Sequence, residues 1–216
     1  MRKVFLGFVF ALFAGSTSGE PLTIAAMGDS LTQGYGLSEQ DGFVPQLAKW
    51  LKNQGAEVTL INAGVSGDTT AGGAARAGWT LTPEVDAMIV TLGGNDILRG
   101  IAPKVARDNI EVILRAAQAA KVNVLLIGLS APGNYGPDYQ SAFNAIYPDL
   151  AAQYGALYVE NFLSGVMGAD GRINLTLMQG DAIHPDAKGV SRIVNDLGPH
   201  VLRLILQTRE DTQSGG

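Results

Sequence analysis

Short apolar runs alternate with segments of helical periodicity, and this alternation restricts the fold more than any other feature of the chain. The strand-like runs are residues 22–27, 57–61, 87–92, 122–129 and 156–159. Apolar residues recur at helical spacing in residues 43–51, 71–77, 105–120, 139–154 and 185–206. Continuously apolar strands separated by helices are typical of a parallel sheet buried on both faces. We therefore predict an α/β fold with a sheet between two helical layers.

Glycine-rich polar motifs follow the first three predicted strands directly. They are Gly28-Asp29-Ser30, Asn62-Ala63-Gly64 and Gly93-Gly94-Asn95-Asp96. In open parallel sheets, ligands bind beyond the carboxyl ends of the strands. We therefore expect the three motifs to meet at one edge of the sheet and to form a site there.

Histidine is scarce, because the chain has only two histidines and no cysteine. A base that works near neutral pH is therefore His184 or His200. His184 follows Asp181 by three residues, close enough for the carboxylate to hold the imidazole. His200 lies within the last predicted helix and is interpreted as structural. Together with Ser30, which follows a strand and Gly28, His184 and Asp181 make up the parts of an acyl-transfer triad.

Each member of this set also has a structural interpretation. Ser30 is suited to cap a helix, and Asp181 to occupy a turn after Gly180. His184 has the alternative of being an ordinary surface histidine. Asp186 is a competing carboxylate, although it is better placed to cap the final helix.

An oxyanion needs donors, and the same motifs supply them. Asn95 offers a side-chain amide, and Ser30 and Gly64 offer backbone N–H groups. The alternatives are an asparagine turn for Asn95 and a simple turn glycine for Gly64. Asp29 and Asp96 are interpreted as caps or loop scaffolding rather than reactants.

Several other classes of protein lack support in the sequence. There is no Gly-x-Ser-x-Gly elbow, phosphate-binding loop, dinucleotide fingerprint or His-Glu-x-x-His motif. A two-metal phosphoesterase would draw on more histidines, so we expect neither a metal nor a cofactor. The net charge of −5 disfavours nucleic acid as a partner.

Taken in order, the motifs resemble those of the SGNH (GDSL) hydrolases, with Gly28-Asp29-Ser30-Leu31 first and Asp181-Ala182-Ile183-His184-Pro185 last. The resemblance implies a three-layer flavodoxin-like fold, serine esterase activity and no metal. Within this family the chain is similar to the branch of exported bacterial thioesterases, arylesterases and lysophospholipases. The segments that carry this similarity are Asn134-Tyr135-Gly136 and Leu177-Met178-Gln179. In that branch the Asn134–Gly136 loop is expected to cover the acyl chain.

The predicted reaction is hydrolysis of a small-molecule or lipid ester, including aryl esters, thioesters and lysophospholipids, through an acyl-enzyme. Two alternatives remain open at this point. One is a carbohydrate O-deacetylase of the same fold, which would need a shallow polar cleft. The other is a non-catalytic protein that binds lipid or carbohydrate.

The N-terminus has the pattern of a secretory signal. Arg2 and Lys3 precede an apolar run, residues 4–14, that is too short to span a bilayer as a mature helix. We predict a signal peptide at residues 1–19, a hydrolase domain at 20–207 and a disordered polar tail at 208–216. An uncleaved anchor is the alternative. The expected location is periplasmic or secreted, without stable membrane insertion after cleavage.

Overall fold

A computed structural model of the protein describes residues 21–214, so the predicted signal peptide at residues 1–19 and the last two residues of the predicted tail lie outside it. The described chain contains one sheet of five parallel strands in the order β2-β1-β3-β4-β5. The strands are β1 (Leu22–Gly28), β2 (Val58–Gly64), β3 (Ala87–Thr91), β4 (Asn123–Ile127) and β5 (Leu157–Val159). The predicted parallel sheet is confirmed.

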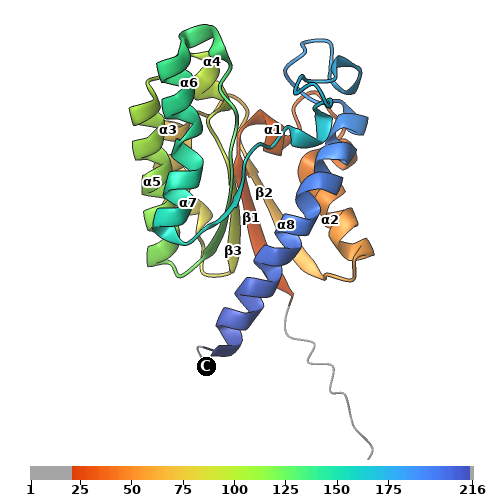
Figure 1. The fold of residues 1–216 in the computed structure, drawn as a ribbon. Helices are drawn as coiled ribbons and strands as arrows, with labels where there is room; N and C mark the ends of the chain where they lie inside the picture. Colours follow the sequence, from red (N-terminus) through yellow and green to blue (C-terminus); the bar gives the residue numbers. More distant parts are fainter. Residues whose placement is uncertain (1–20, 215–216) are drawn as a thin grey trace, which may run out of the picture.

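Helices cover both faces of the sheet (Figure 1). One face carries α2 (Phe43–Asn53) and α8 (Ala187–Ser214). The other carries α3 (Thr70–Thr80), α5 (Pro103–Ala119), α6 (Pro137–Asn144) and α7 (Ile146–Tyr154). Two short helices, α1 (Ser30–Gln33) and α4 (Gly94–Leu98), follow β1 and β3 at the carboxyl edge of the sheet. The predicted three-layer α/β architecture is therefore confirmed.

The apolar pattern explains these layers. Every residue of β3 is buried, as expected for a central strand covered on both faces. The predicted apolar face of the last helix is also buried against the core, and it consists of Val190, Ile193, Val194, Leu197, Val201 and Leu204. No helix within residues 21–214 is long and apolar enough to cross a bilayer.

The last helix runs further than the sequence pattern predicted. Residues 208–214 are the end of α8, so the prediction that they are disordered is wrong. Thr208 is buried, and its hydroxyl donates to the carbonyl of Leu204 at 2.8 Å. Asp211 accepts a hydrogen bond of 2.8 Å from Asn123 at the start of β4. Polar composition concealed these contacts, and the one between Asn123 and Asp211 holds the helix to the sheet.

Two other boundaries also differ. The helix predicted over residues 139–154 is divided at Ala145 into α6 and α7. Strand β2 continues to Gly64, three residues beyond the predicted end at residue 61, and Gly64 is paired in register with Gly28 of β1. This second difference moves the loop that follows β2, and it changes which glycine reaches the site.

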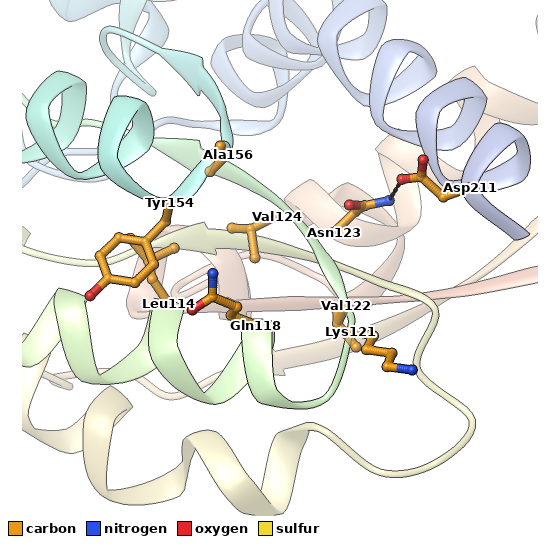
Figure 2. A pocket seen from close by; sticks show the side chains of 10 residues that line it. Leu114, Gln118, Lys121, Val122, Asn123, Val124, Tyr154, Ala156 and Asp211 are labelled. Carbon is orange, nitrogen blue, oxygen red and sulfur yellow. Dashed lines mark hydrogen bonds between the residues drawn. The ribbon is translucent and has the colours of Figure 1, made fainter. Parts of the chain in front are cut away.

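A hollow of about 320 Å³ lies at the amino end of β4 (Figure 2). Its walls come from α5, the start of β4, the link from α7 to β5, and α8. Residues that line it include Leu114, Gln118, Val122, Asn123, Tyr154 and Asp211. It therefore lies at the opposite end of the sheet from the glycine-rich motifs.

Candidate active site

Ser30, His184 and Asp181 form a continuous chain of hydrogen bonds at the carboxyl end of the sheet. The Oγ atom of Ser30 lies 2.8 Å from Nε2 of His184, and Nδ1 of His184 lies 2.6 Å from Oδ2 of Asp181. Ser30 is the first residue of α1, and Asp181 and His184 lie in the loop before α8. With Nδ1 donating to the carboxylate, Nε2 is free to accept the serine proton. The three residues predicted from the sequence are thus brought together.

Backbone contacts fix the carboxylate of Asp181. Its Oδ1 atom accepts the N–H groups of Ile183 at 2.9 Å and His184 at 3.0 Å, while Oδ2 faces the imidazole. The left-handed backbone of Ala182, with φ of 57°, makes this tight turn possible. The hydrogen bonds from His184 and Ile183 lower the pKa of Asp181 to about 2. The group is therefore an anion at any pH near neutrality.

The imidazole is also held from the side of α1. The ring of Tyr35 lies against His184, with 4.6 Å between ring centroids. The side-chain amide of Gln179 donates to the carbonyls of Tyr35 at 2.8 Å and Pro185 at 3.0 Å. These contacts join the loop after the serine to the loop that carries the histidine.

Asn95 points its amide at the same region from α4. Its Nδ2 atom donates to the carbonyl of Asp68 at 2.9 Å and lies 3.5 Å from Oδ2 of Asp29. The second contact is at the limit of a hydrogen bond, so one N–H of the amide is only weakly engaged. Gly93 precedes this helix with φ of 125°, a conformation that favours glycine.

Asp29 lies beneath the serine and is buried. It caps α1, because its Oδ1 atom accepts the N–H of Leu31 at 3.0 Å. Burial raises the pKa of its carboxyl from 3.8 to about 6, and the Leu31 hydrogen bond and the nearby His184 only partly offset this rise. The predicted scaffolding role of Asp29 is confirmed.

The other acidic residues in the motifs are also structural. Asp96 is buried and accepts both the N–H and the hydroxyl of Thr70, at 2.8 and 2.6 Å, at the start of α3. Asp186 accepts the N–H of Gly189 at 2.8 Å in the first turn of α8. Asp186 therefore caps the final helix and leaves Asp181 as the partner of His184.

Gly64 does not reach the site, contrary to the sequence-based prediction. Its N–H donates to Oδ1 of Asn62 at 3.0 Å, and it is absent from the lining of the cleft beside Ser30. A glycine is required there because a Cβ atom would overlap the backbone of Gln33. The role of Gly64 is thus to let β2 approach α1 closely.

Gly67, rather than Gly64, is the glycine after β2 that reaches the cleft. It lines the cleft and has φ of 83°, and within residues 21–214 its N–H has no hydrogen-bond acceptor. The sequence held a signal for this residue, since Ser66-Gly67-Asp68-Thr69 is the turn-rich segment before α3. Because β2 was predicted to end at residue 61, Gly64 rather than Gly67 was assigned to the loop at the site.

The triad opens onto a cleft of about 680 Å³. Its lining is mostly apolar and comes from α4, the loop after β4 and the segment between β5 and α8. Apolar residues at its walls include Ile97, Leu98, Leu129, Met167, Ile173 and Ile183. No lysine or arginine of the described chain lines it.

The predicted substrate loop contributes differently from the expectation. Ala131 and Pro132 line the cleft, but Asn134, Tyr135 and Gly136 do not. Residues Gly133–Tyr135 form a turn of 3-10 helix, in which Tyr135 packs on Tyr139 with 4.9 Å between ring centroids. The start of the loop, rather than its tip, therefore borders the cleft.

Comparisons with known proteins identify the family of the chain. Residues 26–192 match the GDSL-like Lipase/Acylhydrolase family. The chain is 37% identical over 206 residues to Esterase TesA of Pseudomonas aeruginosa, covering 95% of this chain and 100% of the relative. It is 33% identical to an Arylesterase of Vibrio mimicus, covering 86% of this chain and 90% of the relative.

Solved structures give the same result. AlinE4, an SGNH-hydrolase family esterase, superposes with a TM-score of 0.71 at 43% identity, covering 86% of this chain and 97% of AlinE4. The crystal structure of TesA gives a TM-score of 0.76 at 38% identity, with coverage of 84% and 99%. The chain therefore belongs to the GDSL-like lipase/acylhydrolase family, the SGNH hydrolases, and is a carboxylic ester hydrolase.

Proposed function

We propose that this enzyme hydrolyses neutral esters of apolar acyl groups through an acyl-enzyme on Ser30. The observation that carries the proposal is the hydrogen-bonded chain from Ser30 through His184 to Asp181, at 2.8 and 2.6 Å, at the mouth of an apolar cleft. Nucleophile, base and orienting carboxylate are within reach of one another, as acyl transfer requires.

In the acylation step, Oγ of Ser30 attacks the ester carbonyl while Nε2 of His184 takes the serine proton. The imidazolium is stabilised by Asp181, whose low pKa keeps it anionic. His184 then gives the proton to the leaving alcohol as the carbon–oxygen bond breaks. In the second step, water attacks the acyl-enzyme, His184 takes a proton from the water, and that proton returns to Oγ as the acid leaves.

Three donors are available for the negative charge on the carbonyl oxygen. They are the N–H of Ser30, the N–H of Gly67 and the weakly engaged N–H of the Asn95 amide. The N–H of Ser30 belongs to the first turn of α1, where no intrahelical acceptor exists. These donors stabilise the transition state because they are already oriented before the negative charge develops.

The cleft favours apolar acyl groups over acetylated sugars or anionic substrates. A lining of aliphatic side chains without lysine or arginine offers little to a hydroxyl-rich ring or a carboxylate. Each methylene transferred from water contributes roughly 0.8 kcal/mol, so kcat/KM rises by at most about fourfold per methylene until the cleft is filled. Phosphonate inhibition of the related esterase EstA of Pseudoalteromonas sp. also supports a serine nucleophile.

A panel of p-nitrophenyl esters from acetyl to dodecanoyl tests the substrate class. We expect kcat/KM to rise with acyl length and then level off, and to exceed that for acetylated xylose. Ile183, 46% exposed beside His184 in the cleft, offers a sharp variant, and Ile61, 40% exposed on β2 away from the cleft, is its control. Ile183→Ser should lower kcat/KM for long esters more than for acetate, whereas Ile61→Ser should not. A preference for acetylated sugar would favour the deacetylase instead.

We also propose that the enzyme is exported. The basic residues Arg2 and Lys3 and the apolar run that follows are the support. N-terminal sequencing of the protein from periplasmic or culture fractions should find a start near residue 20. Recovery of the full-length chain with membranes would favour an uncleaved anchor.

A further inference from the structure

Arg76 on α3 makes three hydrogen bonds with one guanidinium group. Its Nε atom donates to Oδ2 of Asp68 at 2.7 Å, Nη1 to the carbonyl of Ala63 at 2.7 Å, and Nη2 to the carbonyl of Gly28 at 2.9 Å. The side chain is 22% exposed, so these contacts are largely shielded from water. A planar fork with fixed donor directions can satisfy acceptors on three separate segments at once.

Each acceptor lies at the base of a segment that supplies a donor to the proposed oxyanion site. Gly28 is the last residue of β1, two positions before Ser30. Ala63 and Asp68 flank the turn that carries Gly67. Arg76 is linked to the third donor, Asn95, only indirectly. The carboxylate of Asp68 accepts from Arg76, and the carbonyl of Asp68 accepts from the amide of Asn95 at 2.9 Å.

Other polar contacts between these segments end on Gln33, the last residue of α1: Asn62 donates to its carbonyl at 3.3 Å and Ser66 to its side chain at 2.8 Å. The carbonyl of Gly28 also accepts the N–H of Val65 at 3.0 Å, which brings the end of β1 to the turn after β2. Arg76 itself is not among the residues that line the cleft. Its effect on chemistry must therefore pass through the backbone that it holds.

We propose that Arg76 is a positioning residue that sets the spacing of the three oxyanion donors, those of Ser30, Gly67 and Asn95. The proposal rests on the proposed function and extends it to a residue outside the cleft. Donors act only when they are aimed at the oxygen in its tetrahedral state, and displacement by about 1 Å costs roughly 10²-fold in rate. Without the guanidinium, the turn at Gly67 and the support for Asn95 are free to shift away from Ser30.

The test compares Arg76→Ala, Arg76→Lys and Asp68→Asn with the wild type, at a temperature well below the melting temperature of each protein. Arg76→Ala should lower kcat by roughly 10- to 100-fold with KM changed by less than about threefold, because substrate contacts remain. Arg76→Lys keeps the charge but offers no fork, so it should recover only a small part of the loss. Ethylguanidinium added to Arg76→Ala should restore part of kcat.

Arg115→Ala is the matched control. Arg115 also pairs with a carboxylate, Glu111 at 2.8 Å, and bonds the hydroxyl of Tyr154 at 3.0 Å, but it lies on α5 at the opposite end of the sheet. Its loss should leave kcat unchanged. If Arg76→Ala unfolds, Arg76→Lys and Asp68→Asn carry the test, and both should lower kcat without raising KM.

A second readout separates positioning from general stability. A phosphonate that reacts with Ser30 places an oxygen where the oxyanion forms, so its rate of reaction should fall with kcat in the Arg76 variants. Normal kcat and normal phosphonylation in folded Arg76→Lys and Asp68→Asn would overturn the proposal. Failure of the proposed function is distinct, because wild-type enzyme would then show no adduct on Ser30.

Discussion

The two ends of the sheet each carry a hollow, but the hollows differ in which polar groups face them. At the amino end, Asn123 donates to Asp211 (Figure 2). The hydroxyl of Tyr154 there donates to Glu111 at 2.7 Å. At the carboxyl end, within residues 21–214, the N–H groups of Ser30 and Gly67 have no acceptor. A hollow alone is therefore weak evidence of a site. Donors left without partners beside a nucleophile and base are the stronger evidence.

The largest expected effect is the loss of the Ser30 hydroxyl. Ser30→Ala should lower kcat by roughly 10⁴- to 10⁶-fold because no acyl-enzyme can form. Its free energy of unfolding should change little. Ser66→Ala is the control, since Ser66 also lines the cleft but donates to Gln33 at 2.8 Å. Steady-state kinetics with a p-nitrophenyl ester check both, and a Ser30→Ala enzyme within tenfold of the wild type contradicts the account.

Loss of the Asn95 amide should have the next largest effect. Asn95→Ala should lower kcat by roughly 10²- to 10³-fold, about 3–4 kcal/mol, with KM little changed, because the donor acts mainly in the transition state. Asn95→Asp should be at least as damaging, since it replaces a donor with an anion. The control is Asn62→Ala, which removes an exposed asparagine bonded to Gln33 and Gly64. If Asn95→Ala instead loses only thermal stability, Asn95 is a turn residue.

Ionisation of Asp29, at the carboxyl end of the sheet, should lower the free energy of unfolding of the protein as pH rises. Its pKa is about 6 in the folded protein against 3.8 ordinarily, so the folded state holds this proton more tightly than the unfolded state does. The free energy of unfolding therefore falls between about pH 4 and pH 6, by up to about 3 kcal/mol, and stays lowered above that range.

Asp29→Asn removes this dependence, because the side chain stays neutral. The variant should match the wild type near pH 4 and exceed it in stability at pH 7.5, as measured by urea unfolding at both values. Asp149→Asn, an exposed carboxylate 3.2 Å from Arg107, is the control and should not alter the pH slope. If the free energy of unfolding depends on pH equally in Asp29→Asn and in the wild type, burial does not raise the pKa of Asp29.

The smallest effect belongs to the amino end of the sheet. Asn123→Ala removes the hydrogen bond of 2.8 Å to Asp211 and should lower the free energy of unfolding by about 0.5–1.5 kcal/mol. It should leave kcat unchanged because the contact only holds α8 to β4. Denaturant unfolding and steady-state kinetics on the same preparation check this. A clear fall in kcat would contradict the claim that the amino end of the sheet has no part in catalysis.

Much of the fold was predictable because strand and helix periodicities are local. The apolar runs identified all five strands, and the alternation with helices gave the parallel arrangement. The end of α8 was not predictable in this way, since Thr208 and Asp211 are polar and both lie near Asn123, which is distant in sequence. Contacts such as that between Asn123 and Asp211, 88 residues apart, leave no periodic signal.

The site was predictable where residue chemistry is rare. With two histidines in the chain, the spacing of Asp181 and His184 left few choices. Glycine is common, with 28 in the chain, so composition could not separate Gly64 from Gly67. That choice depends on β2 ending at Gly64, which strand pairing with Gly28 determines. The role proposed for Arg76 was likewise not predictable from the sequence. Its acceptors are two carbonyls and one carboxylate that only the folded chain brings together.

Covalent labelling tests the central claim most directly, namely that Ser30 is the nucleophile at the carboxyl end of the sheet. Wild-type enzyme is treated with an activated ethylphosphonate ester, digested, and mapped by mass spectrometry while residual activity is followed. The account predicts one phosphonyl group, on Ser30, formed in step with loss of activity and greatly slowed in His184→Ala. An adduct on Ser66 or another serine, or full labelling of Ser30 with activity retained, would contradict it.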